Sequence, residues 1–200
     1  MPYYNRSSYN LTLRTALENS LLEREIHKFS FYVKLICQNP FTSDICIALY
    51  WNKFTFEWER ITLPTENNNR VLNTLTSKKE DKEIELILTR ETGQNEIELL
   101  QPLLSQLQKL AIPIDLQLNR QVGRDGHSFK LTLGNEYSYT TCFWEEYSAT
   151  PLWDNLTDFA KTMISIDKQL IATKKETISY SYMYELDHKK ENIFYQISES

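Results

Sequence analysis

Residues 43–63 read SDICIALYWNKFTFEWERITL, and they determine the fold class that the sequence predicts. Two runs rich in β-branched and aromatic residues flank the polar pair Asn52-Lys53, which is typical of a β-hairpin. In the second run two sets of side chains alternate, namely Phe54, Phe56 and Trp58 with Thr55, Glu57 and Glu59. This period of two predicts a sheet with one buried face and one face in water.

Several other segments have the composition or the alternation of strands. They are residues 28–37, 83–89, 116–122, 127–133, 137–146, 176–186 and 191–197. Asp125-Gly126 predicts a tight hairpin between 116–122 and 127–133, because glycine readily supplies the positive φ of such turns. Gly134-Asn135 predicts the next turn of the same meander.

Three segments are expected to be helical. Apolar residues recur at helical spacing over 15–28, and residues 95–112 form a second helical segment, best defined from Pro102 onward. A third helix is expected to begin with Thr150 as its N-cap and Pro151 in its first turn. Because the strands cluster in antiparallel runs with helices between them, the predicted class is α+β: antiparallel meanders with three main helices packed on the sheet or sheets.

The chain has 200 residues, which is enough for one domain with a sizeable core. We expect either a single domain over residues 1–200, or two lobes of about 1–75 and 83–200 joined by the polar segment 65–83. The sequence leaves open whether the two meanders form one sheet or two.

The charge balance argues against some classes of partner. Lys and Arg number 22 and Asp and Glu 27, so the formal charge is −5 and no basic face for phosphate groups is indicated. The apolar runs are shorter than the roughly 20 residues of a membrane span, and no signal peptide is visible. The three cysteines sit in apolar segments without a CxxC pair, which is typical of buried reduced thiols. We therefore expect a cytoplasmic protein that binds neither nucleic acid nor membrane.

No GxSxG, P-loop, GxGxxG or paired-aspartate metal motif occurs, and we expect neither a cofactor nor a metal. The main catalytic alternative is the pair of His127 and Asp125, a loop histidine beside a carboxylate that could exchange protons. The competing interpretation is a polar residue at the start of a strand. Glu23 and His27 share a helix face by spacing, but they supply only two metal ligands, so a surface ion pair is favoured.

The aromatic content is more distinctive, with 12 Tyr, 9 Phe and 4 Trp. Tyr and Trp are enriched at protein interfaces, where they bring a large contact area and a polar tip with few rotatable bonds. The alternating tyrosines at 137–139 and 180–184 are either a docking surface or rings that cover the inner face of the sheet. Acidic residues surround the first group, which disfavours stacking on nucleic acid.

Residues 139–156, YTTCFWEEYSATPLWDNL, join a strand to the third helix. We expect Trp144 and Trp153 to meet where the strand packs on that helix. On the opposite face of the strand lie Tyr139, Thr141 and Phe143. The connection between the two elements is the predicted site of contact with a protein partner: Glu145, Glu146 and Tyr147.

Residues 124–163 carry a partial resemblance. An Asp-Gly turn, a strand (HSFKLTLGN), a strand that ends on Phe-Trp (CFWEE) and a helix that starts with Pro-Leu-Trp (PLWDNLTDFAKTM) resemble a pattern in small bacterial proteins of immunity or uncharacterised type. Members of such groups are often encoded beside secreted toxins and block them by binding. The resemblance implies a cytoplasmic, cofactor-free protein that neutralises a cognate toxin or effector by direct contact. The alternative is an enzyme or small-ligand-binding protein with a site near Asp125 and His127.

Overall fold

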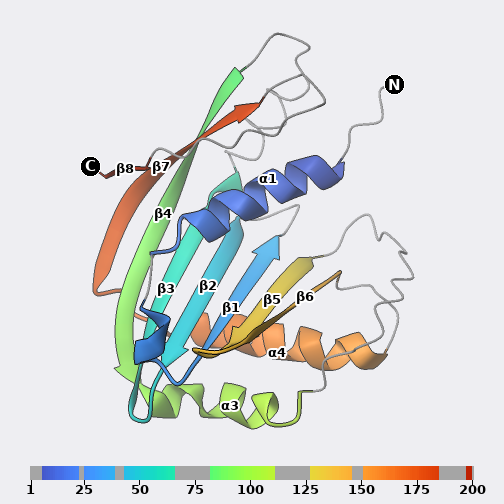
Figure 1. Ribbon diagram of the computed structural model, residues 1–200, viewed down its shortest axis with the longest axis vertical. Helices are drawn as coiled ribbons and strands as arrows, with labels where there is room; N and C mark the ends of the chain where they lie inside the picture. The colour runs from blue at the N-terminus through green and yellow to red at the C-terminus, as the bar shows by residue number, and fades with distance from the viewer. Residues whose placement is uncertain are drawn as a thin grey trace.

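The structure is a computed structural model that describes residues 6–22, 25–38, 43–65, 82–110, 127–145, 151–184 and 197–199. One eight-stranded sheet runs through it in the order β6-β5-β1-β2-β3-β4-β7-β8 (Figure 1). Every neighbouring pair of strands is antiparallel. The α+β class with an antiparallel sheet is therefore confirmed, and strands from before and after residues 66–81 belong to the same sheet.

The elements have the following bounds. The strands are β1 (Phe31–Gln38), β2 (Asp44–Trp51), β3 (Thr55–Leu63), β4 (Lys82–Glu96), β5 (Ser128–Gly134), β6 (Tyr139–Glu145), β7 (Lys174–Tyr184) and β8 (Ile197–Glu199). The helices are α1 (Arg6–Asn19), α3 (Gln101–Leu107) and α4 (Pro151–Asp167), and two short 3-10 turns are η1 (Ile26–Lys28) and η2 (Ile97–Leu100).

The hairpin predicted around Asn52 is confirmed as β2 and β3. Its register pairs Trp51 with Phe56, and the Asn52 side-chain oxygen accepts a hydrogen bond from the Phe54 backbone N–H at 3.1 Å. The prediction of one face in water is wrong for these strands, because Glu59 is 0% exposed. Helices cover both faces of the sheet at this point, so Glu59 is buried although it belongs to the polar set, whereas Thr55 and Glu57 are only partly buried.

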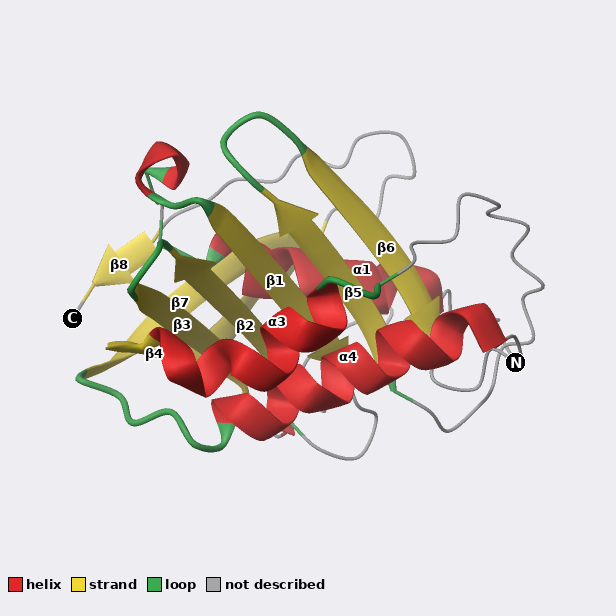
Figure 2. Ribbon diagram, turned by 90° about the horizontal axis from the view of Figure 1, so that it is seen from below, coloured by secondary structure: helices red, strands yellow, loops and turns green. Residues whose placement is uncertain are grey.

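Helices α3 and α4 cover one face of the sheet (Figure 2). The aromatic side chains buried there include Phe56, Trp58, Phe129 and Trp144. The rings of Trp144 and Trp153 lie 6.1 Å apart between centroids at an interplanar angle of 18°. The contact predicted between the strand and the following helix is therefore confirmed, and the Trp144 Nε1 also donates to the Thr157 hydroxyl at 2.9 Å.

Helix α1 covers the opposite face, where its apolar side chains pack on β1, β2, β3, β4 and β7. The predicted helix over 15–28 has the wrong bounds, since α1 begins at Arg6 and ends at Asn19. The chain leaves the helix because the next backbone groups bind charged side chains of the sheet. The Ser20 carbonyl accepts from Arg90 Nη2 at 2.6 Å, and the Leu22 N–H donates to Glu59 at 2.9 Å. The spacing of apolar residues cannot predict these two contacts, because they join residues that are distant in sequence.

Two other predicted bounds need correction. Strand β4 continues to Glu96, so α3 begins only at Gln101, with Pro102 in its first turn. The predicted pairing of residues 127–133 with residues 116–122 across Asp125-Gly126 is wrong, because β5 has β1 on one edge and β6 on the other. The remaining expectations for 116–122, for most of 65–83 and for 191–196 lie outside the described residues.

Three general expectations can also be compared with the structure. All three cysteines are buried, and none forms a disulfide. Gly134-Asn135 does open the turn between β5 and β6. In the part of the chain that the structure describes, no helix is both long and apolar enough to cross a membrane.

Candidate functional site

The most exposed aromatic side chains of the described residues include one in the turn before β6 and one at the start of β6. Tyr137 is 87% exposed and Tyr139 73%, and Phe143, further along the same strand, is 39% exposed. Thr141 lies between the two strand aromatics and is also exposed. We call these four residues the β6 surface: Tyr137, Tyr139, Thr141 and Phe143. Aromatic rings exposed to water along one face of a strand mark a surface suited to a protein partner.

The turn between β5 and β6 fixes the near end of this surface. The Asn135 side-chain oxygen accepts hydrogen bonds from the backbone N–H groups of Tyr137 and Ser138 at 2.9 and 3.0 Å. The Asn135 N–H in turn donates to the Ser138 carbonyl at 2.9 Å. An Asn side chain that mimics a backbone turn in this way orders a two-residue loop, so Tyr137 is held at the head of the strand.

Helix α1 borders the far end of the β6 surface. The Arg14 guanidinium lies 4.2 Å from the centroid of the Phe143 ring, and its Nη2 donates to Gln38 Oε1 at 3.1 Å. Burial lowers the pKa of Arg14. Nearby, Lys130 of β5 forms an ion pair with Glu18 of α1 at 2.5 Å. Phe143 therefore contacts a cation and is still partly exposed to solvent.

Two rows of charged residues cross strands β3, β4 and β7, one row on each face of the sheet. They arise because consecutive residues of a strand point to opposite faces. On the face of α4 the row is Arg60, Glu91 and Lys175, and on the face of α1 it is Glu59, Arg90 and Glu176. The order of charge is plus, minus, plus on the first face and minus, plus, minus on the second.

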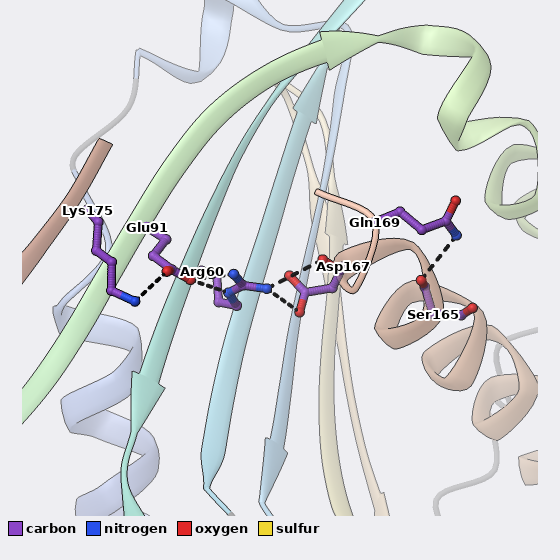
Figure 3. Close-up of polar contacts among 6 residues, drawn as sticks. All are labelled: Arg60, Glu91, Ser165, Asp167, Gln169 and Lys175. Carbon is purple, nitrogen blue, oxygen red and sulfur yellow. Dashed lines mark hydrogen bonds and ion pairs between the residues drawn. The ribbon is translucent and has the colours of Figure 1, made fainter. Parts of the chain in front are cut away.

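The row on the α4 face continues to the end of that helix (Figure 3). Arg60 lies between two carboxylates: its Nε donates to Glu91 Oε2 at 2.8 Å, and its Nη1 is 3.0 Å from Asp167 Oδ2. Lys175 reaches the other oxygen of Glu91 at 2.9 Å. Arg60 also places its positive charge at the C-terminus of α4, where the helix dipole favours a cation.

The two carboxylates of this cluster have opposite pKa shifts. The hydrogen bond from Lys175 and the guanidinium of Arg60 lower the pKa of Glu91. Burial raises the pKa of Asp167, and the attraction of Arg60 reduces that rise without reversing it. The Asp167 Oδ1 atom is buried without a hydrogen-bond partner among the described residues. The cluster ties α4 to the sheet through charges that already have opposite charges beside them, so we assign it a structural role.

The predicted site residues have different outcomes. Glu145 ends β6, paired with Ser128, whereas Glu146, Tyr147 and Asp125 lie outside the described residues. His127 is described, and its ring stacks on Phe129 at 5.8 Å between centroids. Within the described ranges, no group of three or more His, Cys, Asp or Glu side chains could hold a metal ion.

Comparisons of the chain with protein-family models, with curated proteins and with solved structures gave no match. The immunity-type resemblance of residues 124–163 therefore stays a prediction. The alternation in the sequence places Tyr139, Thr141 and Phe143 on one face of their strand. That this face is the open one depends on where α1 lies.

Proposed function

We propose that this protein is a cytoplasmic binding protein that neutralises a cognate bacterial toxin or effector by direct contact, in the manner of an immunity protein. The observation that carries the proposal is the β6 surface, where Tyr137, Tyr139 and Phe143 are exposed beside one another on an ordered hairpin. Exposed aromatic residues are the usual anchors of a protein interface, because each brings a large apolar area to a partner. Glu145, one of the residues predicted to contact a partner, is the last residue of the same strand.

The polar groups around the surface also support binding rather than chemistry. Lys130 of β5 pairs with Glu18 of α1, and Arg14 of α1 lies over the Phe143 ring, so these charged groups at the rim of the surface have contacts within the protein. A surface that is ordered before binding loses less side-chain entropy when a partner arrives. His127, the residue of the catalytic alternative, is in contact with a buried ring, and no observation within the described residues favours that alternative.

The test is co-expression with the product of the adjacent gene. We expect the two proteins to co-purify and the chain to relieve any growth defect that the neighbour causes. If the pair neither co-purifies nor relieves toxicity, the proposal is wrong.

A matched pair of variants localises the contact. Tyr139→Ala should weaken binding by about thirtyfold or more, since loss of an interface anchor costs roughly 2 kcal/mol or more. Phe54→Ala is the control, because Phe54 is 68% exposed at the turn between β2 and β3, away from the β6 surface. Equal loss of binding in both variants would show that the β6 surface is not the contact.

A further inference from the structure

The backbone of β6 points alternately toward β5 and away from the sheet. The Asn135 N–H donates to the Ser138 carbonyl, so the hydrogen-bonded pairs of this hairpin follow at every second residue from that pair. The residues whose backbone groups bind β5 are Thr140, Cys142 and Trp144. The residues whose N–H and C=O groups point away from β5 are Tyr139, Thr141 and Phe143. These three also carry the exposed side chains of the β6 surface.

The two edges of the sheet differ in how they are protected. At one edge, β8 pairs with part of β7, and the start of β7 carries the exposed Lys174 and Lys175 and the partly buried Glu176. At the other edge, β6 has no charged residue and no proline from Tyr139 to Trp144, and its pairing with β5 has no bulge. Charges, prolines and bulges are the usual means of keeping an edge strand from pairing with another chain. No strand among the described residues pairs with the outer side of β6.

We propose that β6 is a docking edge, and that the protein partner adds an extended segment to it as an additional strand. This inference rests on the proposed function, because it specifies how the partner engages the same surface. An extended chain is the occupant that fits, since only a strand presents N–H and C=O groups at the spacing of Tyr139, Thr141 and Phe143. Its residues beside the two aromatic rings are uncharged, because they pair with those rings across the new ladder. Main-chain bonds then supply affinity and the rings supply selectivity.

The inference can be tested with a probe that does not depend on the adjacent gene. Random peptides of about nine residues, which is enough to span a strand, are displayed on phage and selected on the wild-type protein. We expect the selected peptides to alternate, with uncharged residues at every second position. They should bind the Thr141→Pro variant at least about tenfold more weakly, because proline removes the outward N–H and places its ring where the added strand would lie.

Three variants distinguish a loss of peptide binding at the edge of β6 from a loss of folding. Thr141→Ala keeps the backbone N–H and should bind the peptides within about threefold of the wild type. Thr141→Pro should keep a cooperative unfolding transition near that of the wild type, because its N–H makes no bond to β5. Thr140→Pro removes an N–H that does bind β5, and it should destabilise the fold markedly.

Amide hydrogen exchange in the wild-type protein gives a second readout that needs no variant. In the protein alone, the amides of Thr140 and Cys142 should exchange slowly and those of Thr141 and Phe143 quickly. A bound peptide should slow the exchange of the Thr141 and Phe143 amides. Protection of Thr141 and Phe143 in the protein alone would overturn the inference, because the edge would already be occupied.

The other possible outcomes of these experiments also support or overturn the docking edge. If no peptide is selected, or if the peptides bind Thr141→Pro as well as wild type, β6 is not a docking edge, whatever the adjacent gene product does. If the wild type forms dimers that Thr141→Pro abolishes, the occupant is a second copy, and the proposed partner segment is wrong. If the neighbour fails to bind but peptides bind β6 as described, the proposed function falls and the docking edge stands.

Discussion

Arg90 of β4 forms an ion pair with Glu59 of β3 at 3.2 Å, although the two side chains are only 3% and 0% exposed. The pair lies under the end of α1, where Arg90 also binds the Ser20 carbonyl and Glu59 accepts from the Leu22 N–H. Glu176 of β7 completes the contacts of Arg90 at 2.9 Å. A buried charge is tolerated when it is paired and hydrogen-bonded, and this cluster meets both conditions.

Loss of Arg90 should therefore destabilise the protein strongly. Arg90→Met removes the cation beside a fully buried carboxylate, and we expect a loss of about 3–5 kcal/mol in the free energy of unfolding, measured with urea. Lys174→Ala is the control, because the Lys174 side chain is 67% exposed and its ion pair with Glu176 contributes little. A double variant, Glu59→Gln with Arg90→Met, should recover part of the loss. A loss below about 1 kcal/mol in Arg90→Met would contradict this account.

The hydrogen bond between Trp144 and Thr157 should make a measurable contribution to the packing of α4 on β6. Thr157→Val keeps the shape of the side chain but leaves the indole N–H buried without its acceptor, at a cost of about 1–3 kcal/mol. Thr157→Ser keeps the hydroxyl and should lose only about 1 kcal/mol or less, the cost of one methyl group. Chemical denaturation of both variants is the measurement. Equal losses in the two would show that the methyl, and not the hydrogen bond, matters.

The opposite pKa shifts of Glu91 and Asp167 predict opposite dependences of stability on pH. The pKa of Glu91 is lowered, so its contribution is present above the ordinary pKa of a glutamic acid and is lost as pH falls through the folded value. The pKa of Asp167 is raised by burial, so its contribution is present at low pH and is lost as pH rises through the folded value.

Two variants measure these contributions separately by urea unfolding between about pH 3 and pH 7. Relative to Glu91→Gln, the wild type should lose stability as the pH falls. Relative to Asp167→Asn, it should lose stability as the pH rises from about 4. Stability differences that change in the same direction for both variants would contradict the assignment of burial as the dominant effect on Asp167.

Gly93 has no space for a side chain. A Cβ atom at this position would lie 2.7 Å from Trp58 Nε1 and 2.8 Å from two carbons of the same ring. Trp58 is 0% exposed, and its Nε1 donates to Asn95 at 2.9 Å, so the ring cannot move without breaking that bond. We expect Gly93→Ala to lower the free energy of unfolding by about 1–3 kcal/mol. If the close contact is the cause, the loss on adding Gly93→Ala should be smaller in a Trp58→Phe background.

Several local features of the fold follow from the sequence. The period of two in residues 54–63 predicts β3, and the polar pair after Trp51 predicts its turn, because both signals come from neighbouring residues. Pro151 marks the start of α4 for the same reason. The contact of Trp144 with Trp153 is predictable as well, since a short connection brings a strand end close to the helix that follows it.

The candidate site can be predicted only in part from such local signals. Alternation places Tyr139 and Phe143 on one face of β6, but the same pattern in β7 includes Tyr180, which is 3% exposed. The difference is that Tyr180 belongs to the apolar cluster beneath α1, whereas Tyr139 stays 73% exposed. No local rule separates the two tyrosines, because the covering helix comes from the other end of the chain.

The sequence by itself therefore determined most of the described strands, the turns at Asn52 and Gly134 and the start of α4, which depend on residues only a few positions apart. The tertiary structure decided the order of strands in the sheet, the end of α1 and the face of β6 that stays open. It also decided the two rows of charge, in which Arg60 meets Glu91 across 31 positions and Arg90 meets Glu176 across 86. Such pairs depend on the register of strands distant in sequence, and periodicity within one strand does not encode that register.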